Sequence, residues 1–279
     1  MLFLKATPPT KVNWPAGTKL VGLDPASLGF VCGGEDKYCS TAYANFYSSF
    51  KDGSGRATPA IRKKYGIDGK LVFVSYSAGL GFVSPLLNND ADRADIAAVV
   101  LMDSTFGSGY TGYQKAAKDA AAGKFNLVSV TSDKGNTDPH YNGDYAWREA
   151  VLKPAGLLDM PSASPVPPMP TPGEGVFHQG SLWYYRYKDA EYAHQNLGKL
   201  LVPVSEAHIL PILSGAGVGS TTSASSGISP IVVLASLAAV AGGAYAWTNM
   251  RSNDGRGGYE SRARAPRRVG DRGRRRRVG

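Results

Sequence analysis

The sequence is poor in cysteine and lacks several motifs. Cys32 and Cys39 are its only cysteines among 279 residues, and no second Cys or His pair follows at the spacing of a structural zinc site. We therefore expect either two ordinary thiols or a local disulfide, and no metal. The GxxxxGK(S/T) and GxGxxG phosphate-binding patterns are absent, so we expect no nucleotide cofactor. The N-terminus has no apolar stretch of the length that a cleavable secretory signal needs.

Acidic residues are scarce in one region, which determines the net charge. The chain carries a formal charge of +9, but residues 251–279 contain 11 arginines against only three acidic residues. The rest of the chain is therefore close to neutral. We predict that 251–279 is a disordered basic tail that contacts anionic lipid headgroups, and we do not expect a nucleic-acid partner.

One uncharged apolar run lies just before this tail. Residues 231–247 contain no charged side chain, and the flanking residues extend the run to 230–250, which is long enough to span a bilayer. The Gly/Ser/Thr-rich stretch 211–229 before it is typical of a linker. We predict a single-pass membrane protein. Its orientation stays open, because an arginine-rich flank favours the cytoplasmic side whereas no signal peptide is recognised to export the body.

Residues 1–210 alternate short β-branched runs with helical stretches. This pattern is typical of an α/β fold with a mostly parallel sheet and helices on both faces. The expected strands cover residues 19–24, 70–75, 97–103, 126–131 and 182–187. The expected helices cover residues 40–50, 57–64, 78–88, 111–122, 143–152 and 194–201.

A proline-rich segment interrupts this alternation. Residues 161–172 contain six prolines, which exclude both a helix and a central strand. We interpret 161–175 as either a stiff surface loop or a lid over the site.

The strongest chemical signal surrounds Ser77. A buried strand leads into the sequence SYSAG, residues 75–79, and an apolar helix start follows. A strand, tight turn and helix in this order form a nucleophile elbow, which needs small residues two positions before and after the nucleophile. Ser75 and Gly79 meet this requirement, although Ser75 stands where the pattern usually has glycine. We predict that Ser77 is the nucleophile.

A serine nucleophile needs a base later in the chain. His194 follows the last expected strand, at the edge where open α/β sheets build their sites, and it is our candidate. His140 and His178 precede elements rather than follow strands. His208 is interpreted as an ordinary surface or interface histidine.

The third member should be a carboxylate that orients the imidazole. Asp133 follows the strand before the His194 strand and is favoured, while Asp103 at the end of the preceding strand is the alternative. Asp138 is a weaker third candidate.

A developing oxyanion needs backbone donors. The N–H of Ala78 follows the nucleophile, and a second donor is expected from Ala26 or, as we prefer, Ser27, because Pro25 has no N–H. Aromatic residues close to these motifs either line an acyl pocket or, more commonly, belong to the core. They are Tyr76, Phe82, Phe106, Tyr110 and Tyr113.

Together, the segments SYSAG, VVLMDS, NLVSVTSD and DAEYAHQNLGKLL resemble the α/β-hydrolase superfamily over residues 19–210. The resemblance implies a cofactor-independent serine hydrolase that acts on a small-molecule or lipid ester, amide or thioester through an acyl-enzyme. Only one expected strand precedes the elbow strand, so the resemblance implies either a compact sheet, similar to that of cutinases, or a chain without the N-terminal strands of the family. The alternative is a catalytically inactive hydrolase-like domain that acts as a membrane-anchored binding module.

Overall fold

The computed structural model describes residues 1–4, 6–30, 40–106, 109–135, 137–138 and 142–215. The two cysteines, His140, the predicted membrane span 230–250 and the basic tail 251–279 lie outside these residues, as does most of the predicted linker. Within the described residues, no helix has both the length and the apolar character that a membrane crossing requires.

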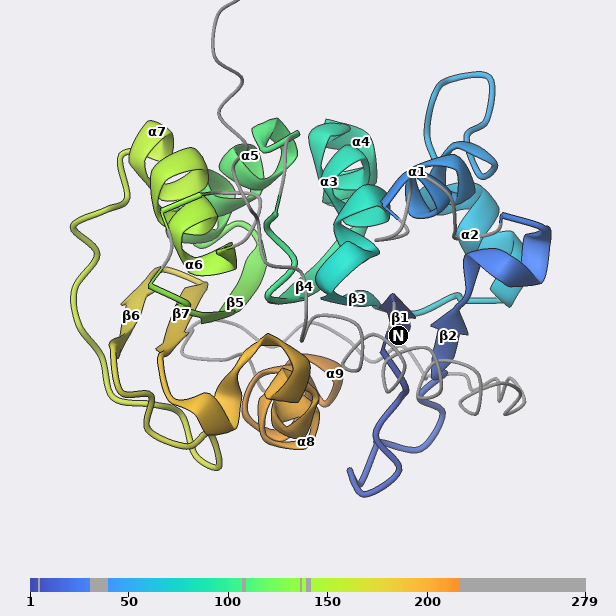
Figure 1. Cartoon of the computed structure of the whole chain (residues 1–279). Coiled ribbons are helices and arrows are strands. Elements are labelled where there is room, and N and C mark those ends of the chain that lie inside the picture. The colour runs from blue at the N-terminus through green and yellow to red at the C-terminus, as the bar shows by residue number, and fades with distance from the viewer. Residues whose placement is uncertain (5, 31–39, 107–108, 136, 139–141, 216–279) are drawn as a thin grey trace, which may run out of the picture. The chain divides into compact units, whose positions relative to one another are not determined.

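The described chain forms an α/β fold around one seven-stranded sheet, in the order β2-β1-β3-β4-β5-β7-β6. All neighbouring strands run parallel except β6 and β7, which pair antiparallel. The predicted α/β fold with a mostly parallel sheet is therefore confirmed (Figure 1). The strands are β1 (Leu2–Leu4), β2 (Val21–Leu23), β3 (Leu71–Tyr76), β4 (Ile96–Met102), β5 (Asn126–Ser132), β6 (Gly175–Gln179) and β7 (Leu182–Tyr187).

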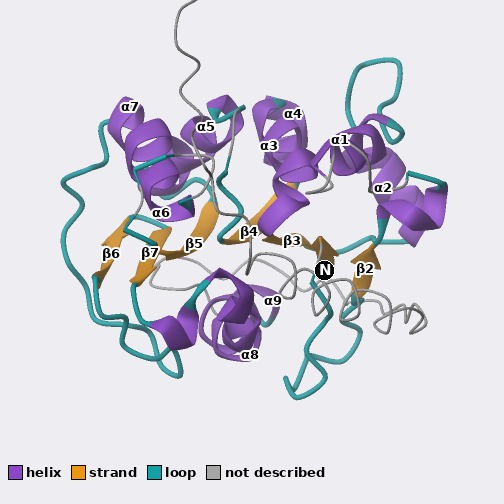
Figure 2. Ribbon diagram, viewed as in Figure 1, coloured by secondary structure: helices purple, strands orange, loops and turns teal. Residues whose placement is uncertain are grey.

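The central strands are buried on both faces, as their sequences predicted. In β3, Leu71 and Phe73 face one apolar core, while Val72 and Val74 face the other. Because side chains alternate along a strand, one continuous apolar run supplies both cores. Helices α1 to α7 cover one face of the sheet, and α8 and α9 lie against the opposite face (Figure 2).

The helices match most of the expected ranges. The α-helices are α1 (Ser40–Ser48), α2 (Thr58–Tyr65), α3 (Leu80–Asn88), α4 (Asp90–Ala94), α5 (Thr111–Ala121), α6 (Gly143–Ala146), α7 (Lys153–Ala155), α8 (Leu201–Val204) and α9 (Leu210–Leu213). The 3-10 and π-helical segments of the described residues are η1 (Pro25–Leu28), η2 (Ser77–Gly79), η3 (Trp147–Leu152), η4 (Ala190–Tyr192), η5 (His194–Leu200) and η6 (Ser205–Ile209).

The structure corrects two features of the predicted fold. Strands β1 and β6 were not predicted, and β1 lies between β2 and β3, so β2 is not the neighbour of β3. The helical stretch that begins at His194 continues through α8 and η6 to α9, well beyond residue 201. His208 lies on this stretch and is buried, so of the two interpretations, a surface or an interface histidine, the surface position is wrong.

The proline-rich segment is fastened to β7. The hydroxyl of Tyr187 donates to the Pro170 carbonyl at 2.8 Å, and the Val166 N–H donates to the Tyr185 hydroxyl at 3.3 Å. Met169 is buried in the core on the side of α8 and α9. These contacts dock the segment against the sheet.

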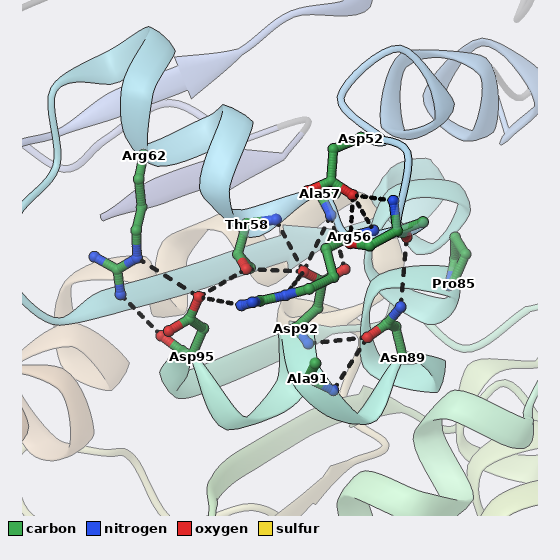
Figure 3. Close-up of polar contacts among 12 residues, drawn as sticks. Asp52, Arg56, Ala57, Thr58, Arg62, Pro85, Asn89, Ala91, Asp92 and Asp95 are labelled. Carbon is green, nitrogen blue, oxygen red and sulfur yellow. Dashed lines mark hydrogen bonds and ion pairs between the residues drawn. The ribbon is translucent and has the colours of Figure 1, made fainter.

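A buried carboxylate joins α2 to α4 (Figure 3). Asp92 has no exposed surface, and it accepts hydrogen bonds from the N–H groups of Ala57 and Thr58 and from the Thr58 hydroxyl. Arg56 bonds the adjacent Asp95 at 2.8 Å. Because the first N–H groups of a helix have no partner within it, Asp92 satisfies them at the start of α2.

Candidate active site

Ser77 lies on a strained turn at the carboxyl end of β3. The strand ends at Tyr76, and the chain turns through η2 directly into α3. Ser77 has φ = 50°, a left-handed conformation that is costly for a residue with a side chain. A positive φ at the residue between strand and helix is the geometry of a nucleophile elbow, in which the strain lifts the hydroxyl above the sheet edge.

Hydroxyl groups hold this turn in place. The Ser104 hydroxyl donates to the Ser77 carbonyl at 2.9 Å, and the Ser75 and Ser104 hydroxyl oxygens are 2.6 Å apart. Because the Ser104 proton is used for Ser77, Ser75 is the donor in the second bond. The serine at position 75, where the elbow pattern usually has glycine, thus adds a hydrogen bond to the support of the turn.

Gly79 is required at the other side of the elbow. A Cβ at this position would lie 2.6 Å from the Ser75 hydroxyl oxygen and 2.9 Å from Leu4 Cβ. We expect Gly79→Ala to lower the free energy of unfolding by about 1–3 kcal/mol, because the packed elbow must shift to admit a methyl group. Chemical denaturation measures this loss.

The matched control is Gly22→Ala in β2, where nothing lies within 4 Å of the point that the new methyl group would occupy. It should leave the free energy of unfolding unchanged or slightly higher. Equal stability of the two variants would contradict the close packing of the elbow.

His194 bridges Ser77 and a carboxylate. Its Nε2 lies 3.1 Å from Ser77 Oγ, and its Nδ1 lies 2.8 Å from Asp103 Oδ2. An ionised carboxylate only accepts hydrogen bonds, so Nδ1 carries the proton and Nε2 accepts from the serine hydroxyl. This tautomer is the one that a general base for Ser77 requires.

The partner of His194 is Asp103, the alternative acid, and not the favoured Asp133. Asp103 directly follows β4, the sheet neighbour of β3, and its side chain has no exposed surface. Its Oδ1 also accepts the Ser132 N–H at 3.2 Å. It has φ = 46°, a conformation that aspartate tolerates better than most residues. The carboxylate is therefore held in one orientation beneath the imidazole.

Asp133 is engaged elsewhere. It accepts hydrogen bonds from the Gly135 N–H at 2.7 Å and from Asn142 Nδ2 at 3.0 Å, and Arg186 of β7 lies 3.7 Å away. Burial opposes its ionisation, but the two hydrogen bonds and the charge of Arg186 outweigh this effect and lower its pKa. The prediction of Asp133 failed because β5 lies one strand farther from β3 than β4 does. Asp138, the third candidate, takes part in neither hydrogen bond of the His194 ring, since Nδ1 bonds Asp103 and Nε2 bonds Ser77.

Of the two predicted oxyanion donors, Ala78 lies next to Ser77, whereas Ser27 follows a strand that does not border β3. Ala78 directly follows Ser77 in η2 and is buried. Ser27 lies in η1 after β2, one strand beyond β1, and the Ala26 N–H donates to the Asp24 carboxylate instead. The strand that borders β3 on this side is β1. Ser27 therefore does not follow the strand that borders β3.

The five aromatic candidates separate into two groups. Phe82 and Tyr113 are buried in the core, and Tyr110 packs against it. Tyr76 and Phe106 instead contact the His194 ring, with ring centroids 5.3 Å and 5.1 Å away. A contact between an aromatic ring and His194 was not anticipated from the sequence, and the position of Tyr76 next to Ser77 is the local signal that could have found it.

The chain was compared with protein-family models, with curated proteins and with solved structures. None of them matches it.

Proposed function

We propose that this chain is a serine hydrolase of the α/β-hydrolase type, which cleaves an ester, or an amide or thioester, through an acyl-enzyme. The chain of hydrogen bonds from Ser77 through His194 to Asp103 carries this proposal. Support comes also from the strained φ of Ser77, since strain of this kind concentrates at functional sites.

In the proposed mechanism, Ser77 Oγ attacks the acyl carbonyl carbon while His194 Nε2 accepts the hydroxyl proton. Asp103 accepts the Nδ1–H bond throughout and stabilises the imidazolium that forms. The Ala78 N–H donates to the oxygen that becomes negative. His194 then returns the proton to the leaving group, and water, deprotonated by the same nitrogen, releases the acid and regenerates Ser77.

A fluorophosphonate probe tests this function, because such probes phosphonylate only an activated serine. The full-length chain should be labelled, and both Ser77→Ala and His194→Ala should lose labelling, since one removes the nucleophile and the other its base. Ser49→Ala and His178→Ala are matched controls. Ser49 donates to the Phe46 carbonyl, and His178 bonds the Gly180 carbonyl, so neither touches the triad.

Labelling that persists in Ser77→Ala would overturn the nucleophile assignment. A folded wild-type chain that takes no label would favour the inactive binding module instead. Circular dichroism of each variant distinguishes these results from unfolding.

We further propose that residues 230–250 anchor the protein to a membrane and that the arginine-rich tail contacts anionic lipid. Only the sequence supports this part, through its uncharged apolar run and the adjacent 11 arginines. Deletion of 230–250 should release the protein from the membrane fraction of cells. Retention of the deleted form in that fraction would contradict the anchor.

A further inference from the structure

Tyr76 contacts His194 in two separate ways. Its hydroxyl donates a hydrogen bond to the His194 backbone carbonyl. Its ring also stacks on the imidazole, with centroids 5.3 Å apart and planes inclined by 15°. Tyr76 is the last residue of β3 and directly precedes Ser77. A single residue adjacent to the nucleophile thus holds both the main chain and the ring of the base.

This double contact matters because of the segment that carries His194. The histidine begins η5, and the residue before it, Ala193, has an extended conformation outside the sheet. The imidazole therefore has no strand of its own to fix it. The hydroxyl of Tyr76 supplies a tie to β3, whose final residue is held by pairing with Met102 of β4.

A second aromatic ring completes the enclosure of the imidazole. Phe106 meets the His194 ring nearly at a right angle, at 84°. The imidazole of His194 thus contacts Tyr76 on one plane and Phe106 on another. These contacts restrict its rotation about the side-chain bonds. The distance of 3.1 Å between Nε2 and Ser77 Oγ is maintained by these contacts together with Asp103.

The tie to the His194 carbonyl needs a protonated hydroxyl on Tyr76. Burial and the charge of Asp103 raise the pKa of Tyr76 to about 12, so its hydroxyl remains a donor at neutral pH.

We propose that Tyr76 is a positioning residue for His194, which ties the histidine backbone to β3 through its hydroxyl and fixes the orientation of the imidazole through its ring. This inference rests on the proposed hydrolase function of the same site. It assigns to a residue of the elbow itself the control of where the base lies.

Two substitutions separate the two contacts. Tyr76→Phe removes the hydrogen bond and keeps the ring, so kcat for ester hydrolysis should fall about threefold to tenfold with an unchanged KM and pH profile. Tyr76→Leu removes both contacts, so kcat should fall further than in Tyr76→Phe. Tyr192→Phe is the control, because it also removes a tyrosine hydroxyl, but from a ring that packs on Tyr187.

The ring contact is measured by NMR, from the chemical shifts of the His194 imidazole carbons, in the Ser77→Ala background as well as in the active chain. A stacked aromatic ring displaces these resonances through its ring current, so they should move in Tyr76→Leu and stay close to their wild-type positions in Tyr76→Phe. This measurement requires no turnover, so it tests the ring contact even if the hydrolase proposal fails the labelling test. Unchanged His194 chemical shifts in Tyr76→Leu, together with unchanged kcat in Tyr76→Phe, would overturn the inference. If Tyr76→Leu does not fold, the kcat of Tyr76→Phe decides.

Discussion

Asp103→Asn is expected to lower kcat/KM for ester hydrolysis by about 10⁴-fold, the loss typical of an amide in place of a triad carboxylate. The carboxylate accepts the His194 Nδ1–H at 2.8 Å while fully buried. An asparagine can offer its amide N–H to Nδ1 instead, which places the imidazole proton on Nε2. In that tautomer Nε2 can no longer accept the Ser77 proton, and the imidazolium loses its counter-charge.

The measurement is steady-state hydrolysis of a p-nitrophenyl ester by the full-length chain. Asp133→Asn is the matched control, since it removes the other carboxylate that follows a neighbouring strand. Asp133 bonds Asn142 and lies near Arg186 rather than His194, so its substitution should cost less than about tenfold. If Asp133→Asn loses most of its kcat/KM while Asp103→Asn stays active, Asp103 is not the acid of the triad.

The sequence allowed prediction of the strands that carry the clearest apolar runs. Strands β3, β4, β5 and β7 coincide with expected ranges to within one or two residues. The missed strand β1 has only three residues, too few for an alternation pattern. The missed strand β6 pairs antiparallel at the sheet edge and directly follows the proline-rich segment. Short and edge strands are thus formed by tertiary pairing that local sequence does not encode.

The candidate site was predictable where its signal is local. Ser77 became a candidate because the elbow pattern occupies five consecutive residues, and His194 because it follows a strand, and the structure brings these two side chains within 3.1 Å of each other. The acid depends instead on which strands are neighbours. Asp103 and Asp133 both follow buried strands, and only the order β3-β4-β5 places the first of them nearer to Ser77. The choice of Ser27 as an oxyanion donor depends on strand order in the same way, since β1 lies between β2 and β3.

The burial of His208 is another feature that the sequence did not predict. Its sequence context, near the predicted linker, favoured a surface position. The structure buries it on η6, where its Nε2 lies 2.8 Å from the Tyr185 hydroxyl and its ring packs against Trp183. Its Nδ1 has no hydrogen-bond partner among the described residues. A neutral imidazole tolerates this environment, whereas a protonated one would bring an additional N–H and an unpaired charge into the core.

Acid should therefore destabilise the protein through His208. Burial, and to a smaller extent the charge of His178, lower the pKa of His208 from 6.5 to about 3. Between these two values the unfolded chain binds a proton that the folded chain excludes, so stability falls as the pH decreases from about 6.5 toward 3. At pH 4.5 this contribution should amount to about 2–3 kcal/mol relative to pH 7.

Urea denaturation at a series of pH values measures this loss, and His208→Gln isolates it. Glutamine does not titrate and can still bond the Tyr185 hydroxyl, so the variant should lose less stability than wild type between pH 7 and 4.5, by about 2–3 kcal/mol. His178→Gln is the control, and because burial is the larger cause, it should retain most of the wild-type acid dependence. Parallel pH profiles for wild type and His208→Gln would mean that His208 binds its proton equally well in the folded and unfolded chains.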